Sequence, residues 1–390
     1  MRTHGPSLDR RTLLATTGAG ALAGLAGCLG FGNDEKPASP AAASGGDEAG
    51  RADAESNGSL TDHEYTQPAP VIDVQEQGHE STMRTVPARH ELVTSEAKGG
   101  PLELPEVWAW QADDHAPSVP GPRYRVPEGE TFEIHFENTE HDRSHTIHLH
   151  ALAKDWKDDG VPSTTGIQVN PGESHTYTYE ADVPGTHLYH CHFQTANHMD
   201  MGMYGLVRVT PDDEDPPDRE YFLTLREWDS DLHHREAGAD DVSYDTAERD
   251  PTLYTINGRS APTTYHPEQG TPLIASAGER VRVHVVNAGY ENHGFHTHGH
   301  RFEVVEKDGT PIPPERRTEM DVLDVAPAER YAVELTTDSD PGIYPVHCHK
   351  VDHVTNDGSY PGGMVTALVY EEVMDSPEFR SVMDAAGYEG

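Results

Sequence analysis

The feature that most constrains the fold of this chain is an internal repeat, in which strand-like segments and histidine motifs recur in the same order. The repeated pieces are residues 132–138 with 281–287, 145–150 with 293–298, and 190–192 with 347–349. The offset between matched pieces runs from 148 residues (145 to 293) to 157 residues (190 to 347). So regular a spacing indicates the tandem duplication of one folding unit.

Each copy has the pattern of β-structure. Phe132, Ile134 and Phe136 alternate with polar residues, as do the valines of the second copy, and this two-residue period is typical of half-buried strands. The 30 prolines leave little room for long helices. We therefore predict an all-β fold of two tandem Greek-key β-sandwiches or barrels, over residues 65–212 and 213–374. Residues 375–390 form a C-terminal tail with room for a short helix.

The first residues are predicted to serve export and tethering. Arg10 and Arg11 precede a short, weakly apolar stretch that ends in Leu-Ala-Gly-Cys28. The arginine pair resembles a twin-arginine export signal, and the last four residues resemble a lipobox with a lipidated cysteine. We assign residues 1–28 to this signal, with an uncleaved anchor helix as the alternative, and residues 29–64 to a disordered acidic tether. The expected location is the outer face of the cell membrane, with the protein anchored by lipid at Cys28 or secreted.

The charge balance excludes a function in nucleic-acid binding, which needs a basic face. The chain has 28 Lys and Arg against 68 Asp and Glu, a formal net charge of -40. We interpret this acidity as a halophilic adaptation to molar salt, where a Debye length of about 3 Å screens the repulsion. A surface that binds cations is the alternative. With only three cysteines, Cys28, Cys191 and Cys348, a disulfide scaffold is also excluded.

Alternation along a strand sorts the histidines onto two faces, because neighbouring side chains of an extended strand point to opposite sides. If Cys191 points into its own sandwich, His190 and His192 must point out of it, and the same holds around Cys348. Within each His-x-x-His-x-His motif, the first histidine lies opposite the other two. Each copy therefore offers one inward and one outward set of candidate metal ligands.

The inward sets combine two imidazoles with a thiolate and a thioether, which is the ligand set of a blue-copper electron-transfer centre. They are His145, Cys191, His198 and Met203 in the first copy, and His293, Cys348, His353 and Met364 in the second. The outward sets contain imidazoles alone and suit a cluster of three copper ions. They are His148, His150, His190 and His192, and His296, His298, His347 and His349. Zinc is disfavoured, because a set of one Cys, two His and one Met is unusual for it.

Four His-x-His motifs, with cysteine at the centre of the last one in each copy, resemble those of the multicopper oxidases. From about residue 85 to 372, the chain looks like a two-domain, laccase-like member of that family with a mononuclear centre in each cupredoxin domain. The resemblance implies copper as the cofactor, in type 1 centres and a trinuclear type 2/type 3 cluster. It also implies that a small-molecule or metal-ion donor loses single electrons at type 1 copper, and that O2 is reduced to water at the cluster. Phenols, aromatic amines, Fe(II) and Cu(I) are the donors used in the family.

The resemblance carries three further expectations. Asp159 resembles the family's proton-relay carboxylate, although an acid before glycine is also common in turns. The ring edges of His198 and His353 are the expected places where electrons reach the type 1 centres. Because four outward histidines must face four from another domain, we expect a homotrimer with a cluster at each subunit interface.

Two other functions remain open. A copper nitrite reductase also has tandem cupredoxin domains, but that family lacks the second His-Cys-His, which would leave His192 and residues 347–349 without a role. A non-catalytic electron carrier or copper buffer would not need eight outward imidazoles. Among the other aromatic residues, we expect Trp108 in the core, and His233 and His234 on the solvated surface.

Overall fold

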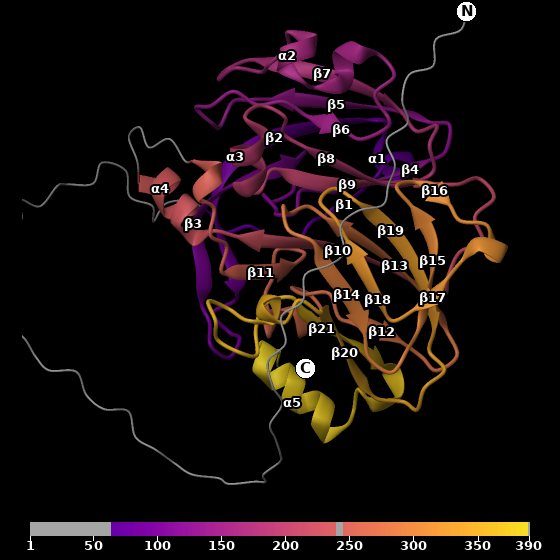
Figure 1. Ribbon diagram of the computed structural model, residues 1–390. Coiled ribbons are helices and arrows are strands. Elements are labelled where there is room, and N and C mark those ends of the chain that lie inside the picture. Colours follow the sequence, from indigo (N-terminus) through magenta and orange to yellow (C-terminus); the bar gives the residue numbers. More distant parts are fainter. Residues whose placement is uncertain (1–63, 239–244, 389–390) are drawn as a thin grey trace, which may run out of the picture. The chain divides into compact units, whose positions relative to one another are not determined.

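The computed structural model describes residues 64–238 and 245–388, which form the layered sheets of Figure 1. Strands make up 42% of the structure and helices 16%, so the predicted all-β fold class is confirmed. Strands between residues 71 and 210 build two sheets, and strands between residues 219 and 370 build two more. We call these parts the first half and the second half. The predicted signal, lipobox and most of the tether lie outside the described residues.

The first half has a five-stranded sheet of order β1-β4-β9-β8-β6 and a four-stranded sheet of order β3-β2-β5-β7. Its strands are β1 (Val71–Asp73), β2 (Glu80–Val93), β3 (Leu102–Ala112), β4 (Arg123–Pro127), β5 (Thr131–Glu137), β6 (His148–Leu149), β7 (Ser174–Glu180), β8 (Gly185–His190) and β9 (Tyr204–Thr210).

The second half has a sheet of order β11-β10-β13-β19-β15-β16, with β17 also paired to β15, and a sheet of order β12-β21-β20-β14-β18. Its strands are β10 (Arg219–Trp228), β11 (Leu253–Ile256), β12 (Leu273–Ala275), β13 (Arg280–Asn287), β14 (His293–Thr297), β15 (Phe302–Lys307), β16 (Thr310–Pro311), β17 (Glu319–Met320), β18 (Val322–Val325), β19 (Arg330–Thr336), β20 (Ile343–Cys348) and β21 (Val365–Tyr370).

The helices are short, as the proline content predicts. The α-helices are α1 (Val74–Gln77), α2 (Pro162–Thr165), α3 (Thr195–Asp200), α4 (Ser230–Gly238) and α5 (Pro377–Ala386). The 3-10 helices are η1 (Trp156–Asp159), η2 (Thr246–Glu248), η3 (Thr263–Tyr265), η4 (Pro314–Arg316), η5 (Val351–Val354) and η6 (Glu371–Val373). Over the described ranges, no helix has the length and apolar character that a membrane span requires.

Eight strands of each half repeat one topology. The order β3-β2-β5-β7 of the first half corresponds to β11-β10-β13-β19 of the second, and β4-β9-β8-β6 corresponds to β12-β21-β20-β14. The pairing directions correspond as well, since β2 runs parallel to β5 and β10 runs parallel to β13. The repeat in the sequence is therefore a repeat of the fold.

Each half packs a hydrophobic core around its own cysteine. Cys191 and Met203 lie in the core of the first half, and Cys348 and Met364 lie in the core of the second. A third core contains residues of both halves. The first half contributes Ala88, Leu92, Leu104, Val107, Leu188 and Tyr204, and the second contributes Trp228, Leu253 and Val286. Because they share this core, the two halves form one compact unit.

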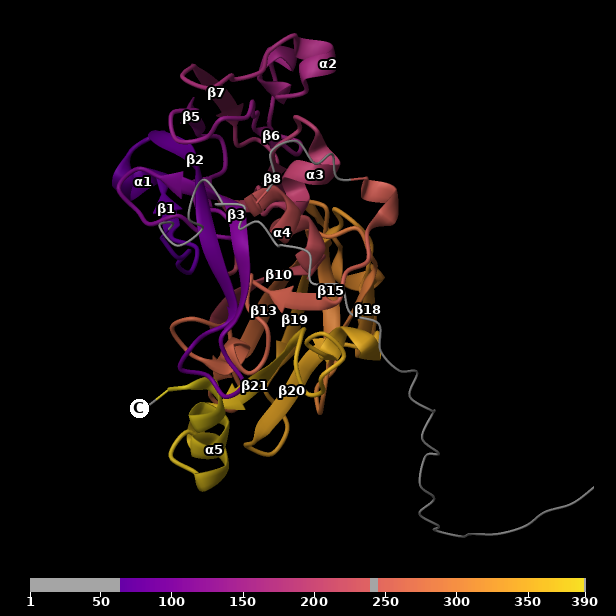
Figure 2. The same cartoon turned by 90° about the vertical axis from the view of Figure 1, so that its left-hand side faces the viewer.

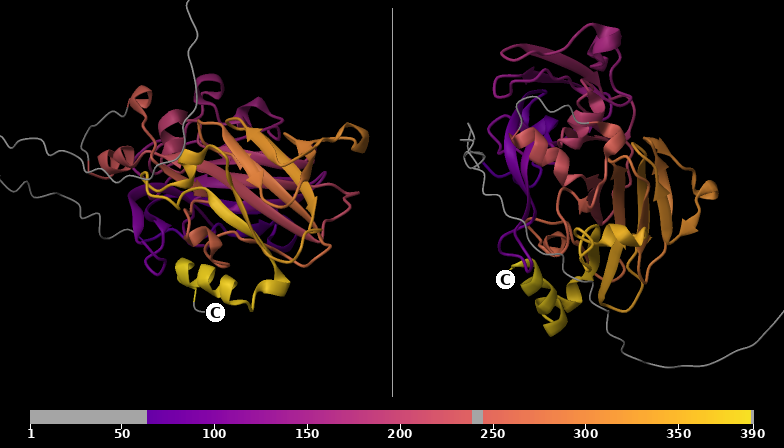
Figure 3. Two further views of the ribbon diagram at one scale, coloured as in Figure 1. Left: turned by 60° about the horizontal axis from the view of Figure 1, so that its bottom comes forward. Right: turned by 60° about the vertical axis from the view of Figure 1, so that its left-hand side comes forward.

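The long β2–β3 pair of the first half extends along the second half, as the indigo strands of Figure 2 show. The Ser260 backbone N–H donates to the Leu92 carbonyl at 2.8 Å. Farther along, the Lys98 N–H donates to the carbonyl of Ala385 in α5, also at 2.8 Å, and both views of Figure 3 place α5 beside this end of the pair. The segment predicted as a tail thus contains a docked helix, whose first turn is capped by the Ser376 hydroxyl.

One prediction about the surface is wrong. His233 in α4 is fully buried, and its Nδ1 lies 2.7 Å from the carbonyl oxygen of Glu106 next to the Trp228 ring. His234 is exposed, as predicted. The adjacent histidines differ because α4 packs one face against β3, so that successive residues of the helix point to different environments.

Candidate metal centres

In the first half, the cysteine and the two histidines of the inward set converge on one point, which we call centre 1. Cys191 follows β8, and His198 lies on α3. The Cys191 Sγ is 3.8 Å from Nδ1 of His145 and 3.3 Å from Nδ1 of His198, and the two nitrogens are 3.1 Å apart. All three side chains are fully buried.

The second half forms the matching centre 2. The Cys348 Sγ lies 3.5 Å from Nδ1 of His353, and that nitrogen lies 3.0 Å from Nδ1 of His293. The loop between the cysteine and the second histidine is two residues shorter than in the first half, six residues against four. The three donor atoms still meet, and in both centres Nδ1 is the nitrogen that faces the others.

The two predicted thioethers occupy equivalent backbone positions, although ten residues separate His353 from Met364 and only four separate His198 from Met203. The Met203 N–H donates to the His198 carbonyl at 3.2 Å, and the Met364 N–H donates to the His353 carbonyl at 2.9 Å. Each methionine carbonyl then accepts the N–H of the centre's cysteine at 3.1 Å. The loop 354–363, six residues longer than its counterpart, therefore leaves this frame intact, and both methionines are fully buried.

A repeated asparagine holds the loop before the first histidine of each centre. The Asn138 side-chain amide donates to the Arg143 carbonyl at 2.6 Å, and the Asn287 amide donates to the Glu291 carbonyl at the same distance. Each amide also donates at 2.9 Å to the strand segment opposite. Arg143 and Glu291 are thus equivalent in backbone position and opposite in charge.

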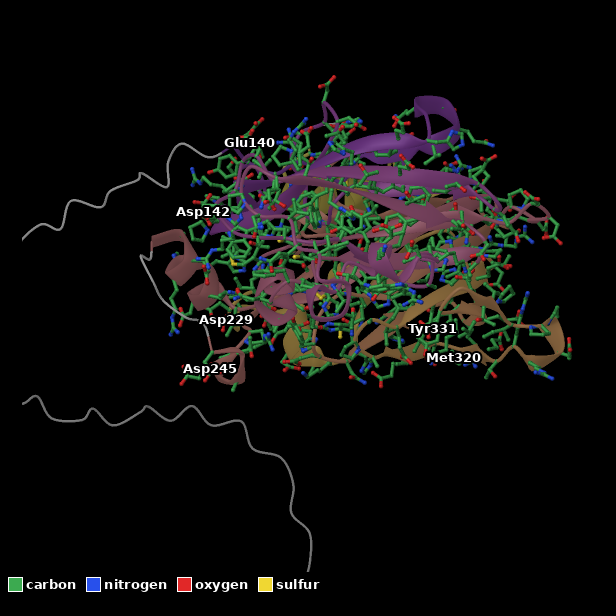
Figure 4. All side chains as sticks on the ribbon, turned by 90° about the horizontal axis from the view of Figure 1, so that it is seen from above. Glu140, Asp142, Asp229, Asp245, Met320 and Tyr331 are labelled. Atoms are coloured by element: carbon green, nitrogen blue, oxygen red, sulfur yellow. The ribbon has the colours of Figure 1, made fainter. Side chains whose placement is uncertain are left out.

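The nitrogens that point away from the centres have different partners in the two halves. Nε2 of His145 lies 2.6 Å from Nδ1 of His141, a buried histidine between the exposed Glu140 and Asp142, which Figure 4 labels at the periphery of the molecule. Nε2 of His293 lies 3.1 Å from a carboxylate oxygen of Glu227, and Nε2 of His353 lies 3.1 Å from one of Glu291. The sequence pattern does not reveal these partners, because none of them belongs to a His-x-His motif.

Burial changes the protonation of the ligands in centre 1. It lowers the pKa of His198 to about 3, with His141 and Arg143 adding to the effect, so the imidazole is a neutral donor. It also raises the pKa of the Cys191 thiol to about 12, and a metal that binds sulfur must therefore displace a proton. In centre 2, burial alone would raise the pKa of Glu227, but the hydrogen bond with His293 and the charge of Arg226 outweigh it and lower this pKa to about 2.

The ring edges of His198 and His353, where electrons are expected to reach the type 1 centres, are not exposed to solvent in the described chain, since both side chains are fully buried. Trp108 packs edge-on against His198, with ring centroids 4.9 Å apart and planes at 84°. Tyr254 stacks on His353, at 4.2 Å and 17°. An aromatic side chain therefore packs against each ring at which electrons are expected to enter.

The outward histidines form two separate sets, as strand alternation predicts. Histidine group 1 contains His148, His150, His190 and His192, and histidine group 2 contains His296, His298, His347 and His349. Within each group the ring centroids of neighbours lie 4.9–5.7 Å apart. Figure 1 shows β6 and β8, which carry group 1, apart from β14 and β20, which carry group 2.

Backbone carbonyls orient the rings of both groups in the same way. The Cys191 carbonyl lies 2.9 Å from Nδ1 of His190, and the Cys348 carbonyl lies 2.9 Å from Nδ1 of His347. A carbonyl can only accept, so Nδ1 carries the proton and Nε2 is left free for a metal. In group 1 the Nε2 atoms of His150 and His190 are 3.1 Å apart, and in group 2 those of His298 and His347 are 3.0 Å apart.

Asp159 lies beside histidine group 1. Its carbonyl is 2.7 Å from Nδ1 of His148, and its carboxylate oxygen is 3.3 Å from the same atom. Asp321 takes the equivalent position beside group 2 through its backbone, with its carbonyl 2.6 Å from Nδ1 of His296. Asp159 closes a turn, since it precedes Gly160 in the left-handed conformation with φ 70°. The two readings of this residue are therefore compatible.

Two family models described as "Multicopper oxidase" match residues 108–214 and 219–372, which contain every residue of both centres and both histidine groups. A solved structure, a blue copper oxidase from Nitrosomonas europaea, is 30% identical over 76% of this chain and 87% of its own, with a TM-score of 0.65. The chain belongs to the multicopper oxidase family. As a member it is an oxidoreductase with copper as its cofactor and a cupredoxin-like fold.

Other relatives of this multicopper oxidase differ in reaction. An L-ascorbate oxidase from Brassica rapa subsp. pekinensis is 30% identical over 57% of this chain, and the match spans 42% of that protein's length. A copper-containing nitrite reductase from Neisseria meningitidis is 28% identical over 68% of this chain and 65% of its own length. The chain thus spans less than two thirds of these curated relatives, and the family alone leaves its reaction open.

The residues present fit copper. Each centre brings one soft thiolate and two imidazole nitrogens to a buried point, which suits copper at an electron-transfer site. Each histidine group offers imidazole nitrogens alone, and in each group backbone carbonyls hold two of the four rings with the proton on Nδ1. Centre 1 and centre 2 bring together the cysteine and both histidines of the ligand sets predicted for type 1 copper.

Proposed function

We propose that this multicopper oxidase couples the one-electron oxidation of a phenol-type or metal-ion donor to the reduction of O2 to water. When bound, copper would supply the redox chemistry: four one-electron oxidations deliver the four electrons that, with four protons, convert one O2 to two waters. The observation that carries the proposal is that each cysteine lies between two histidines of the outward group. One three-residue segment in each half therefore belongs to both kinds of site.

The ligands proposed for the type 1 centres are His145, Cys191, His198 and Met203 in centre 1, and His293, Cys348, His353 and Met364 in centre 2. The eight residues of the two histidine groups are the proposed ligands of the trinuclear cluster. Peptide bonds link Cys191 to His190, and the hydrogen bond between the Cys191 carbonyl and Nδ1 of His190 adds a second connection of 2.9 Å. These two short connections give an electron a route between the sites within the protein.

Proton supply is assigned to Asp159. Its carboxylate oxygen lies 3.3 Å from Nδ1 of His148, and its side chain is 40% exposed. A carboxylate in this position can take a proton from solvent and lies next to the residues proposed to hold the cluster. Because Asp159 also fixes the orientation of His148 through its carbonyl, its two roles use different atoms.

We propose a homotrimer in which group 1 of one subunit faces group 2 of its neighbour. Each group has four imidazoles, and in the described chain their ring contacts stay within one group. His298 and His349 of group 2 are exposed, and purely imidazole surfaces need a partner to complete a site. Light scattering in molar salt tests this: a copper-loaded protein that remains monomeric would contradict it.

Export and surroundings are proposed from the sequence alone. Arg10, Arg11 and Cys28 support twin-arginine export and lipid anchoring at the outer face of the membrane, and the net charge of -40 supports a saline environment. Replacing Cys28 with Ser in the producing cells should release the protein into the medium. Retention of the C28S protein at the membrane would contradict the lipid anchor.

Oxygen consumption is the decisive experiment for the reaction. With a phenolic donor and copper-loaded protein, we expect an oxygen electrode to record uptake in a ratio of one O2 to four oxidised donors. Metal analysis should give about five copper ions per chain, two of them in blue centres. Nitrite consumption in place of O2 uptake would instead support a nitrite reductase, and no consumption of either would support an electron carrier.

A further inference from the structure

The two mononuclear centres have the same ligand atoms but opposite electrostatic surroundings. In centre 2, carboxylate oxygens of Glu227 and Glu291 lie 3.1 Å from Nε2 of His293 and of His353. In centre 1, Nε2 of His145 meets the imidazole of His141. Nε2 of His198 is buried and has no hydrogen-bond partner among the described residues. The comparison is direct, because the two halves share topology, ligand geometry and backbone frame.

Glu227 is built into its position. It is 2% exposed, and one of its oxygens accepts the backbone N–H groups of Tyr290 at 2.5 Å and Glu291 at 3.3 Å. A carboxylate surrounded by donors is the ionised, acceptor-only form. The other oxygen of Glu227, Oε2, faces His293 and lies against Gly289. A Cβ at residue 289 would overlap this oxygen, so the glycine leaves room for the carboxylate.

A second charged residue near each centre also differs, negative in centre 2 and positive in centre 1. The backbone position that Glu291 takes in the second half is taken by Arg143 in the first. The Arg143 guanidinium lies over the ring of Trp108, 5.1 Å from its centroid, and Trp108 packs against His198. Glu291 forms an ion pair of its own with Lys350. Arg226 also acts on Glu227, but its guanidinium pairs with Asp200 at 2.6 Å, so the buried Glu227 is the stronger source of the difference.

We propose that Glu227, with a smaller contribution from Glu291, makes centre 2 the lower-potential copper centre and leaves centre 1 as the higher-potential one. The inference rests on the proposed function only in assuming that both centres bind copper. A carboxylate that accepts a hydrogen bond from the Nε2 N–H makes the imidazole a stronger electron donor to its metal. A negative charge in a buried site also favours the more positive oxidation state. Both effects stabilise Cu(II) over Cu(I) in centre 2 and have no counterpart in centre 1.

The test uses two proteins that each keep one centre, since Cys348→Ser retains centre 1 and Cys191→Ser retains centre 2. A redox titration followed by the blue absorption band gives each potential. We expect centre 2 to lie lower by at least 59 mV, which is a tenfold change in the equilibrium for one electron. Equal potentials, or the reverse order, would overturn the proposal. If neither protein shows a blue band, the proposed function fails first.

Three substitutions in the Cys191→Ser protein assign the difference to the carboxylates. Glu227→Gln removes the charge, and Gly289→Ala keeps the charge but pushes the carboxylate away from His293, so both should raise the potential of centre 2. Glu291→Gln should raise the potential of centre 2 less. Because the Glu291 side chain is 31% exposed, this variant tests the charge without changing a buried residue. The matched control is Glu227→Gln in the Cys348→Ser protein, where the potential of centre 1 should stay unchanged. Should none of the three move centre 2, Glu227 and Glu291 do not set its potential.

Discussion

Centre 1 and centre 2 show which features a duplicated fold keeps and which it lets change. Both keep three donor atoms and a backbone frame in which each methionine bonds the second histidine and the cysteine. They differ in the partners of the Nε2 atoms, which point away from the ligand atoms. In centre 1 one Nε2 meets an imidazole and the other has no hydrogen-bond partner among the described residues, whereas in centre 2 each meets a carboxylate. Backbone hydrogen bonds fix where the ligands lie, while side chains from other strands decide the charge around them. One ligand geometry can therefore serve two potentials.

The two histidine groups differ as well, in exposure. His190 of group 1 is 6% exposed, whereas His298 and His349 of group 2 are open to solvent. Part of the cover over group 1 comes from the second half, because Arg330 on β19 reaches within 3.4 Å of Nδ1 of His150. This makes group 2 the more accessible face for a neighbouring subunit.

The largest effect is expected when both halves lose their cysteine. The double variant Cys191→Ser/Cys348→Ser should lose the blue absorption and the donor-dependent uptake of O2 entirely, because no thiolate remains to receive an electron. The eight outward histidines are unchanged, so part of the copper should still bind. Turnover that continues at the original rate would contradict the assignment of the two centres.

A smaller loss is expected from the carboxylate beside group 1. Asp159→Asn keeps the carbonyl that orients His148 but cannot carry a proton, so O2 reduction should slow by about 10²-fold, the lower end of general acid catalysis. The solvent isotope effect on turnover should rise, while the blue band stays unchanged. The matched control is Asp321→Asn, where the contact with His296 is made by the backbone. Equal losses in the two variants would argue against a proton-relay role for Asp159.

Next in size is the copper affinity of centre 1. His141→Phe removes the imidazole that fixes the ring of His145 and should weaken copper binding at centre 1 by about 10–100-fold, as is usual for such supporting residues. A competition titration with a copper chelator in the Cys348→Ser protein measures the affinity. The same substitution in the Cys191→Ser protein should leave centre 2 unaffected. A change of equal size there would mean that His141 acts on the fold as a whole.

The sequence predicts much of this arrangement because its signals are local. Strand alternation around Cys191 and within the His-x-x-His-x-His motifs gives the inward and outward sets correctly, since a strand has only two faces. Loop length, in contrast, is a poor guide to Met364: the ten-residue loop before it, six residues longer than in the first half, still returns the chain to the position that Met203 takes there. What matters there is where the chain re-enters the sheet.

The features of the site that the sequence does not predict depend on contacts between segments far apart in the chain. Glu227 lies 66 residues before His293 and comes from β10, so no spacing rule points to it. The same holds for the packing of Trp108 against His198 and of Tyr254 against His353. Such contacts follow from how sheets and loops pack together, and a single sequence does not encode them as a pattern.

The smallest effect we predict concerns the aromatic cover of centre 2. Tyr254 stacks on His353 and donates from its hydroxyl to the Pro251 carbonyl at 3.0 Å. Tyr254→Phe keeps the stacked ring, whereas Tyr254→Leu removes it, so the leucine variant should lose about 0.5–1.5 kcal/mol more in the free energy of unfolding. Chemical denaturation of the metal-free proteins in molar salt measures both. If the phenylalanine variant is the less stable of the two, the hydroxyl, and not the ring, holds this cover over His353.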